Sequence, residues 1–523
     1  MGLLSPVAED SGTYGASGAQ TIAQILGSPP AGSPPFSGAA LTGNAATPSQ
    51  GSWQFSLNAG RSWTSLPTNL AVDGSAALLL AADTLIRFSP SPDFNGTPGP
   101  LNLRPLSASN LPWITAAAPY GNQQGFIASW ISENQDGSGS GIYAQRFNAS
   151  GAPIGSEFRV NSTTASNQQF PDLTQLSGGR FLISWMSENQ DGSSWGIYAQ
   201  LYNPDGTPSG SEFRVNTTTS DQQNEPVVAA LSDGGFLISW MSHAQDGSSW
   251  GVYAQRYDAN GAKAGPETLV NTTTNDQQHS PTIAVLIDGT YLIAYQGANQ
   301  PGSSGWDIYA QRFSSTGATL GGEIRLNDAS LGNGQYEPAI APLANGGYIA
   351  TWQDDGRDGS SWGIYARLFA ADGTPAAAEF RVNTVTNDQQ AEPEVAVLAD
   401  GSFVISWHSH AQDGSSWGIY AQRFSASGTP LGSEFRVNTR TDNEQHTPDI
   451  TTLADGGFVI SWQSVHQDGS DWGVYAQRFA ADGSALGSEF RLNSFTTWSQ
   501  HQVNVAAWGL PLQNLSALGI TNL

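Results

Sequence analysis

The sequence predicts an all-β fold: a seven-bladed β-propeller of four-stranded antiparallel blades, preceded by a small β-sandwich domain. The first observation is a unit of about 55 residues that recurs seven times and is marked each time by one aromatic residue: Trp130, Trp185, Trp240, Tyr295, Trp352, Trp407 and Trp462. The second is that every copy holds four short strand-like runs. The third is that no window keeps the helical period. Repeated four-stranded units are typical of propellers, and a linear β-solenoid is the weaker alternative because its coils are usually shorter.

The four runs are clearest in the third copy. They lie at 226–231, 234–240, 251–257 and 267–271, and clusters of Gly, Asp, Asn and Ser separate them. In an antiparallel meander the loop after the second strand and the loop after the fourth strand emerge on one face. These are the long polar loops of every copy. We therefore expect any site to lie on this loop-rich face, because β-scaffolds carry function on their loops.

The ends of the repeat region predict how the ring closes. The first-strand motif occurs eight times, beginning at 112–118 and ending at 503–508, whereas the other three strands occur seven times each. We expect the last copy to complete the first blade, where it displaces or competes with 112–118. Such closure removes the free sheet edges that promote aggregation.

The composition excludes two classes of partner. The chain has 523 residues, a formal net charge of −25 and Lys263 as its single lysine. Nucleic acid and anionic membrane surfaces both require a basic patch, so neither is expected to bind. There is no run of 18 apolar residues, so no membrane insertion is expected. The absence of cysteine excludes a disulfide framework, and no secretory signal is identified at the N-terminus.

The domain boundaries follow shifts in composition. Residues 1–40 form a turn-rich segment, 41–106 the β-sandwich, 107–508 the propeller and 509–523 a tail. Within 41–106, two motifs resemble the cadherin- or immunoglobulin-like modules of large bacterial RTX-type adhesins. The matching residues are Trp53, Phe55, Ser56, Asn58, Gly60 and Trp63, then Arg87, Phe88, Pro90, Asp93, Phe94, Asn95 and Gly96.

The propeller repeat also resembles a known group. Its motifs D-G-G-F-x-I-S-W, Q-D-G-S-x-x-G-I-Y-A-Q-R-F and E-F-R-V-N are similar to repeats of secreted bacterial proteins found beside hemolysin-type calcium-binding modules. This resemblance implies an extracellular or cell-surface location. The tandem nonapeptides that bind calcium in those neighbouring modules are absent here, which speaks against calcium-driven folding.

The strongest constellation on the loop-rich face is the Q-D-G turn, which resembles the Asp-box of sialidase-like propellers. Its aspartates are Asp136, Asp191, Asp246, Asp358, Asp413 and Asp468. Asp accepts backbone N–H groups across such a turn, so a purely structural turn is the favoured interpretation. The alternative is calcium binding, because oxygen ligands suit a hard cation. Asp354, Asp355 and Asp358 form the densest acidic cluster. Calcium is therefore the one cofactor that this pattern of aspartates indicates as possible.

The same loops carry a tryptophan in most copies, and two interpretations stay open. Exposed rings would make a platform that stacks on sugar rings. Rings packed between blades would instead stabilise the propeller, and this is the favoured interpretation. The residues are Trp195, Trp250, Trp362, Trp417 and Trp472.

Taken together, these features predict a non-catalytic extracellular module for adhesion or surface assembly, with a glycan or protein ligand on the loop-rich face. The alternatives are a purely structural component of an extracellular or virion-like assembly, in which copies dock onto one another, and a sialidase-like glycan hydrolase. We expect no enzyme, because a catalytic site requires residues that occur in one blade and not in the others. The visible deviations do not combine into an acid, a base and a nucleophile: Lys263, Tyr295, Pro301, Arg357 and Glu444.

Overall fold

The structure is a computed structural model. It describes residues 125–508 apart from 301–304 and 329–333, and before them 20–21, 38–44, 47, 50–56, 64–65, 78–81, 85–90 and 101–106. The chain divides into two compact units, one of residues 1–123 with 510–523 and one of residues 124–509. No helix in the described part is long and apolar enough to span a membrane.

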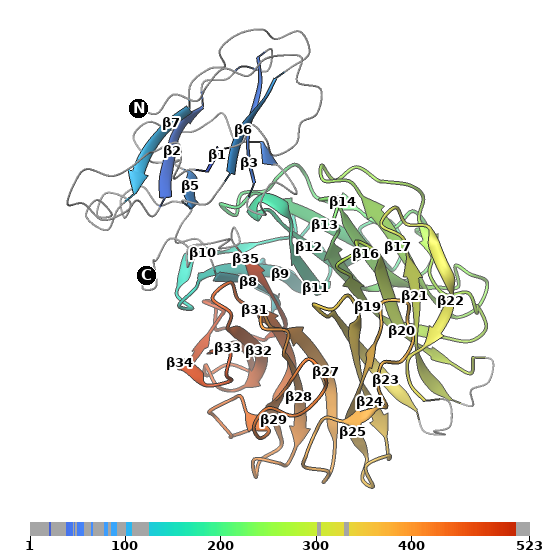
Figure 1. Ribbon diagram of the computed structural model, residues 1–523. Coiled ribbons are helices and arrows are strands. Elements are labelled where there is room, and N and C mark those ends of the chain that lie inside the picture. Colours follow the sequence, from blue (N-terminus) through green and yellow to red (C-terminus); the bar gives the residue numbers. More distant parts are fainter. Residues whose placement is uncertain are drawn as a thin grey trace. The chain divides into compact units, whose positions relative to one another are not determined.

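The unit 124–509 contains seven four-stranded antiparallel sheets arranged as blades around an axis (Figure 1). The predicted seven-bladed propeller is thus confirmed. Blades are numbered in chain order, and blade 1 is β35-β8-β9-β10. The innermost strands are β11 (Gln168–Gln175), β15 (Gln223–Ala230), β19 (Gln278–Val285), β23 (Gln335–Pro342), β27 (Gln390–Val397), β31 (Gln445–Thr452) and β35 (Gln500–Trp508).

The second and third strands of each blade pair along their whole length. The second strands are β8 (Gly125–Glu133), β12 (Phe181–Glu188), β16 (Phe236–His243), β20 (Tyr291–Ala298), β24 (Tyr348–Asp355), β28 (Phe403–His410) and β32 (Phe458–Val465). The third strands are β9 (Ser140–Asn148), β13 (Trp195–Tyr202), β17 (Trp250–Tyr257), β21 (Trp306–Phe313), β25 (Trp362–Phe369), β29 (Trp417–Phe424) and β33 (Trp472–Phe479).

The outermost strands vary in length from blade to blade. They are β10 (Pro153–Arg159), β14 (Phe213–Arg214), β18 (Thr268–Leu269), β22 (Thr319–Arg325), β26 (Phe380–Arg381), β30 (Phe435–Arg436) and β34 (Ala485–Arg491). One short 3-10 helix, η3 (Ser177–Gly179), forms the turn between β11 and β12.

The ring closes as the sequence predicts. β35 pairs antiparallel with β8 and completes blade 1, with Gln500 opposite Ser132 and Trp508 opposite Gly125. The competing segment 112–118 lies outside the described residues.

The core lies between the blades. The landmark aromatic residues of the second strands are fully buried, which explains why the repeat keeps them: Trp130, Trp185, Trp240, Tyr295, Trp352, Trp407 and Trp462. The described part of the propeller holds seven buried apolar clusters, and each contains side chains of two neighbouring blades. Burial of apolar surface therefore joins every blade to the next.

A repeated amide pair joins the polar edge of each interface. The Asn that ends the E-F-R-V-N motif accepts the N–H of a third-strand residue and donates to the Gln that opens the next innermost strand. In blade 6, Asn438 accepts from Ile419 at 2.7 Å and donates to Gln445 at 3.0 Å. The seven pairs are Asn161–Gln168, Asn216–Gln223, Asn271–Gln278, Asn327–Gln335, Asn383–Gln390, Asn438–Gln445 and Asn493–Gln500.

In the unit that contains the N-terminus, the described strands form two small sheets. One has the order β1-β6-β3-β4 and the other β5-β2-β7. Their strands are β1 (Gln20–Thr21), β2 (Gly38–Asn44), β3 (Gly51–Ser56), β4 (Thr64–Ser65), β5 (Leu78–Ala81), β6 (Leu85–Pro90) and β7 (Leu101–Leu106). Trp53 and Phe88 of the two predicted motifs are buried and pack edge-on, with ring centroids 5.1 Å apart. Several other motif residues, such as Trp63 and Asn95, have side chains outside the described part.

Candidate active site

All seven innermost strands carry the same irregularity next to the axis. The register with the second strand shifts between the second and fifth residue, as in a β-bulge. The third residue has a φ between 48° and 51° at each of these positions: Phe170, Glu225, Ser280, Glu337, Glu392, Thr447 and Gln502. Such φ values are strained for residues other than Gly, and bulges redirect side chains. The third and fifth positions of these strands therefore form a distinct layer of the molecule.

Six acids occupy this layer, and they are not part of the regular repeat. Three are at third positions and three at fifth positions: Glu225, Glu337 and Glu392, then Asp172, Glu394 and Asp449. Blades 1 and 4 contribute none, and blade 6 contributes two. All six side chains are half-buried. We call these residues the axial acids.

Glu394 has the most strongly perturbed pKa of the axial acids. Burial raises it well above the ordinary value of a glutamate, and the carboxylates of Asp449, Asp172, Glu392 and Glu337 raise it further. Like charges that share a poorly solvated space cannot all ionise together. Glu394 also makes no hydrogen bond or ion pair with any described residue. Glu394 is therefore a carboxyl group whose protonated form is favoured by its surroundings.

The neighbouring acids are shifted less. Burial, followed by the charge of Glu337, raises the pKa of Glu225 and of Glu392 to about 7. The Glu392 side chain is 44% exposed, so water reaches it, yet the surrounding protein keeps it from full hydration. Burial also raises the pKa of Asp172 to about 7. Five of the six acids are thus linked electrostatically around Glu394.

At Asp449, backbone hydrogen bonds oppose the effect of burial on the pKa. Burial raises the pKa to about 6, but the N–H groups of Val505 and Ile450 stabilise the charged form. Asp449 accepts from Val505 at 2.5 Å and from Ile450 at 2.8 Å. Because Val505 belongs to the next innermost strand, the same contacts fix the carboxylate in place.

The arrangement pairs a carboxylic acid with a carboxylate. Burial and four neighbouring carboxylates favour the protonated form of Glu394, whereas two backbone N–H groups favour the charged form of Asp449. Neighbouring groups whose environments push their pKa values apart are typical of acid–base catalysis. Sequence reasoning missed these residues because it looked for deviations in the loops and in the repeated motifs. The signal was present in the innermost strands, where E-P recurs at Glu225, Glu337 and Glu392.

The predicted Q-D-G aspartates are turn residues that bind their own backbone. In each, Oδ1 accepts the N–H two residues further on, at 3.0–3.1 Å: Asp136, Asp191, Asp246, Asp358, Asp413 and Asp468. They lie in separate blades. Among the described residues there is no group of three or more acidic or His side chains spaced to hold a metal ion. Calcium binding stays a prediction.

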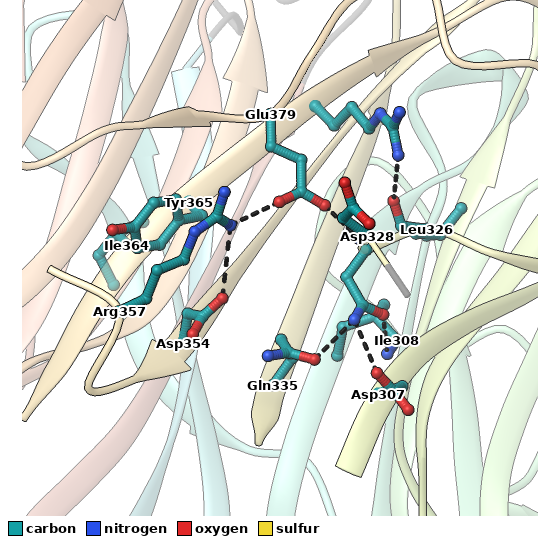
Figure 2. Close-up of polar contacts among 12 residues, drawn as sticks. Asp307, Ile308, Leu326, Asp328, Gln335, Asp354, Arg357, Ile364, Tyr365 and Glu379 are labelled. Carbon is teal, nitrogen blue, oxygen red and sulfur yellow. Dashed lines mark hydrogen bonds and ion pairs between the residues drawn. The ribbon is translucent and has the colours of Figure 1, made fainter. Parts of the chain in front are cut away.

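In the fifth unit, Arg357 joins Asp354 of the predicted acidic cluster to Glu379 (Figure 2). Asp354 is fully buried, and Arg357 lies 3.5 Å from it and 2.5 Å from Glu379. The guanidinium also lies over the ring of Tyr365, 4.1 Å from its centroid. Burial raises the pKa of Asp354 to about 6, while Arg357 opposes the shift. Glu379 accepts the N–H of Asp328 from blade 4, so this cluster links two blades.

The predicted tryptophans lie at the starts of third strands on the loop-rich face, and all are half-buried: Trp195, Trp250, Trp362, Trp417 and Trp472. Trp417 packs edge-on against His408, with centroids 4.5 Å apart, and lies 5.2 Å from His446 of the next blade. Trp250 similarly lies 5.8 Å from His279 of the next blade. The rings thus contact neighbouring blades while keeping some exposed surface.

The loop-rich face is arranged as predicted. In blades 2, 3, 5, 6 and 7, the Ser that follows the Q-D-G motif donates its hydroxyl to a carbonyl of the loop that follows the fourth strand. For example, the Ser193 hydroxyl donates to the Asp221 carbonyl at 3.1 Å, and Ser248 donates to Asp276 at 3.1 Å. Both long loops of a blade therefore share one face.

A Tyr–Glu pair, which a sialidase mechanism would need, does occur in blade 4. Tyr295 donates to Glu323. However, Tyr295 is fully buried, and burial followed by the Glu323 charge raises its pKa well above the usual value. A phenol in this setting resists ionisation, so the pair packs the blade and does not supply a nucleophile.

Comparisons with known proteins give structural neighbours only. No family model and no curated relative matches the chain. An α-L-arabinofuranosidase from Fusarium graminearum is 15% identical, with 62% of this chain and 94% of that chain covered and a TM-score of 0.43. An α-L-arabinanase from Penicillium chrysogenum is 18% identical, with 57% and 88% covered and a TM-score of 0.42. A protein of unknown function from Dyadobacter fermentans is 12% identical, with 57% and 90% covered and a TM-score of 0.42.

Two predictions are corrected at this point. The chain was expected to be a non-catalytic binding or display module and not an enzyme, and the axial acids contradict the ground on which both expectations stood. The physical reason for the error lies in the axial acids. The sequence argument required residues that occur in some blades and not in others, and Glu394 and its neighbours meet that requirement at positions the argument did not consider. The resemblance to adhesin repeats stays a prediction.

Proposed function

We propose that the propeller is a glycoside hydrolase whose chemistry takes place at the axial acids. The observation that carries this proposal is the layer of six axial acids on the bulged innermost strands, in which Asp449 is held by two backbone N–H groups while burial and neighbouring carboxylates raise the pKa of Glu394. Hydrolysis of a glycosidic bond requires two carboxyl groups, of which one donates a proton to the leaving oxygen. The other attacks the anomeric carbon or activates a water molecule.

Glu394 is the general acid in this proposal. Its high pKa keeps the proton available at neutral pH, and its lack of hydrogen bonds leaves the proton free to be donated. Asp449 is the second carboxylate. Its two backbone N–H donors hold it in one orientation and keep it charged, which suits a nucleophile or a general base.

The substrate is proposed to reach the acids from the loop-rich face. The innermost strands begin on that face. The acids at third positions therefore lie closer to it than Glu394 and Asp449, which are at fifth positions; the third-position acids are Glu225, Glu337 and Glu392. The half-buried tryptophans on the same face, such as Trp417, offer aromatic surface to a sugar ring. A glycan is therefore the proposed partner.

The test compares single variants in a screen of aryl glycosides and polysaccharides. Glu394→Gln should lower kcat by roughly 100-fold or more, because general-acid catalysis typically contributes this much. The matched control is Asp372→Asn, an exposed acid in the turn after β25 that bonds only to Thr374. It should keep full activity. Glu394→Gln with wild-type kcat would overturn the assignment, and a screen without any cleavage would overturn the proposed function.

The pH profile offers a second readout. Activity should fall at acidic pH as Asp449 takes up a proton near its pKa of about 6, and at alkaline pH as Glu394 loses its own. The profile of kcat/KM should therefore be bell-shaped. Aryl glycosides with good leaving groups need little help from an acid, so Glu394→Gln should retain more activity on them than on polysaccharides. Equal losses on both would argue against the acid role.

Two expectations outside the propeller are kept as proposals. We propose that the two small sheets between residues 20 and 106 pack as a β-sandwich, supported by the buried pair Trp53 and Phe88. We also propose an extracellular or cell-surface location, which suits a strongly acidic enzyme that acts on glycans.

A further inference from the structure

The fourth-strand motif supplies a ring to the interface with the next blade. In five of the seven blades the Phe of E-F-R-V-N packs against an aromatic residue at the end of the next third strand. The centroid distances are 5.4–6.1 Å for the pairs Phe158–Tyr202, Phe213–Tyr257, Phe380–Phe424, Phe435–Phe479 and Phe490–Phe147. Blade 4 has Ile324 at this position, and it packs into the same kind of cluster. Each of these six side chains fills the outer part of a blade interface.

Blade 3 is the exception, because Thr268 stands where the ring should be. At this interface the structure has a cavity of about 110 Å³. Thr268 lines it together with Phe313 and Tyr291 of blade 4, the two residues against which the missing ring would pack. Gly317 forms a further part of the wall. The equivalent glycine of blade 6, Gly428, lies directly beside the Phe380 ring. The cavity therefore lies where a phenylalanine side chain lies at the equivalent interfaces of other blades.

We propose that this cavity is a binding site for a small aromatic ring of phenyl size. The walls are already shaped for such a ring, because the same backbone holds one in five other interfaces. Ring faces and edges are available from Phe313 and Tyr291, whose centroids are 5.1 Å apart. The wall also includes the apolar side chains of Leu237 and Ile293, together with the polar groups of Arg256 and Thr316. The proposal is independent of the axial acids, since no residue of an innermost strand lines the cavity.

A polar group in the wall defines the ligand more closely. Tyr291 is 3% exposed, and its hydroxyl makes no hydrogen bond with any described residue. Its position in the repeat is occupied by Phe in blades 1, 2, 3, 6 and 7. Burial raises the pKa of Tyr291 to about 12, so the hydroxyl keeps its proton and can donate it. A ring that carries a hydrogen-bond acceptor, such as benzyl alcohol, should bind better than benzene.

The charge in the wall indicates a neutral ligand. Arg256 lines the cavity, but its guanidinium already lies 2.5 Å from Asp233 and 3.4 Å from the carbonyl of Thr316. A ligand carboxylate would have to compete with Asp233 for this guanidinium. The site is therefore expected to take an uncharged aromatic molecule, or the Phe side chain of a peptide.

The experiment measures binding of benzyl alcohol and benzene to the full chain by calorimetry and by thermal shift, with glycerol as the non-aromatic control. We expect saturable binding of one equivalent of each aromatic probe. Thr268→Phe, which restores the repeat, should weaken binding by at least about tenfold and raise Tm without ligand. Tyr291→Phe should remove the preference for benzyl alcohol over benzene and keep the binding of benzene. The same measurement with N-acetyl phenylalanine amide shows whether the Phe side chain of a peptide can enter the cavity.

A gain-of-site variant keeps the proposal falsifiable if Thr268→Phe fails to fold. Phe380→Thr removes the ring from the interface of blades 5 and 6 and should add a second equivalent of bound benzene. No saturable binding of either aromatic probe to the wild type would overturn the proposal. Unchanged affinity in Thr268→Phe would show that the probes bind elsewhere, which would overturn it as well.

Discussion

Glu225 shows how the axial acids connect the proposed chemistry to the stability of the propeller. Its pKa is raised from the usual 4.5 to about 7, mainly by burial. The folded state therefore binds a proton more tightly than the unfolded chain does. The stability that this proton provides is fully present below pH ~4.5 and is lost as the pH rises through about 7. Asp172 and Glu392 shift in the same direction, so their effects add.

We predict that the free energy of unfolding decreases between pH 4.5 and 7.5, and that Glu225→Gln makes this decrease smaller. The expected difference is on the order of 1 kcal/mol per carboxyl, because water inside the ring of strands screens part of the interaction. Urea unfolding at several pH values measures it. Asp355→Asn, which changes an exposed acid on the loop-rich face, is the control and should leave the slope unchanged. A slope that is equal in the wild type and Glu225→Gln would contradict the prediction.

At the level of residues, the sequence predicted the repeated positions better than the unique ones. The fully buried landmarks such as Trp240 were recognisable because every blade needs the same packing. The axial acids were not, because the third and fifth positions of the innermost strands vary from Phe170 to Gln502 and carry no motif. The sequence did contain one signal for the axial acids, namely charged residues at positions that a propeller places around its axis. Whether these side chains share one space depends on the closed ring, which a linear pattern does not contain.

At the level of elements, the amide pairs between blades are the polar counterpart of the apolar interfaces. Asn438 illustrates how many hydrogen bonds the loss of one such amide would break. Its side chain makes three, to Ile419, Arg440 and Gln445. We predict that Asn438→Ala lowers the free energy of unfolding by about 2–3 kcal/mol, because buried donors and acceptors lose their partners. Denaturant titration measures this loss.

The control for that variant is Asn260→Ala in the exposed turn after β17. It removes an amide of the same size without opening an interface, so its effect should stay within about 0.5 kcal/mol. Equal losses for Asn438→Ala and Asn260→Ala would show that the amide pairs contribute little. A larger loss at Asn438 would assign the difference to the contact between blades 6 and 7.

The strands themselves show where local pattern was sufficient. The second and third strands appear where the sequence predicts them, because alternation and the Asp-Gly turns define a hairpin locally. The E-F-R-V-N strand is shorter than expected in four blades. In blade 2, for example, β14 spans only Phe213–Arg214, after an isolated bridge between Tyr202 and Pro208. Proline alone does not explain the short strand, because β10 includes Pro153 at the equivalent position and spans seven residues.

At the level of the whole molecule, the closing interface uses the same contacts as the others. Ser494 of blade 7 donates its N–H to Glu157 of blade 1 at 2.7 Å, as Ser162 does to Glu212 between blades 1 and 2. Gln500 completes the amide pair with Asn493, and Asp449 accepts from Val505. A chain of identical modules thus becomes a ring without any special joint. The closed ring is also what keeps the axial acids close enough to perturb one another.

We predict that a chain ending at residue 499 loses both the propeller's cooperativity and the raised pKa values at its axis. β8 would become an open edge, and the buried side chains of Val503, Val505 and Trp508 would be lost from the two interfaces of blade 1. A chain ending at residue 509 retains β35 and is the matched control. Thermal unfolding should show a broad transition at lower temperature with aggregation for the shorter chain, and an unchanged propeller transition for the control. If the two chains melted alike, β35 would not be required for closure. The position of the Asp449 carboxylate in the proposed site would then not depend on Val505 of β35, from which it accepts an N–H in the intact chain.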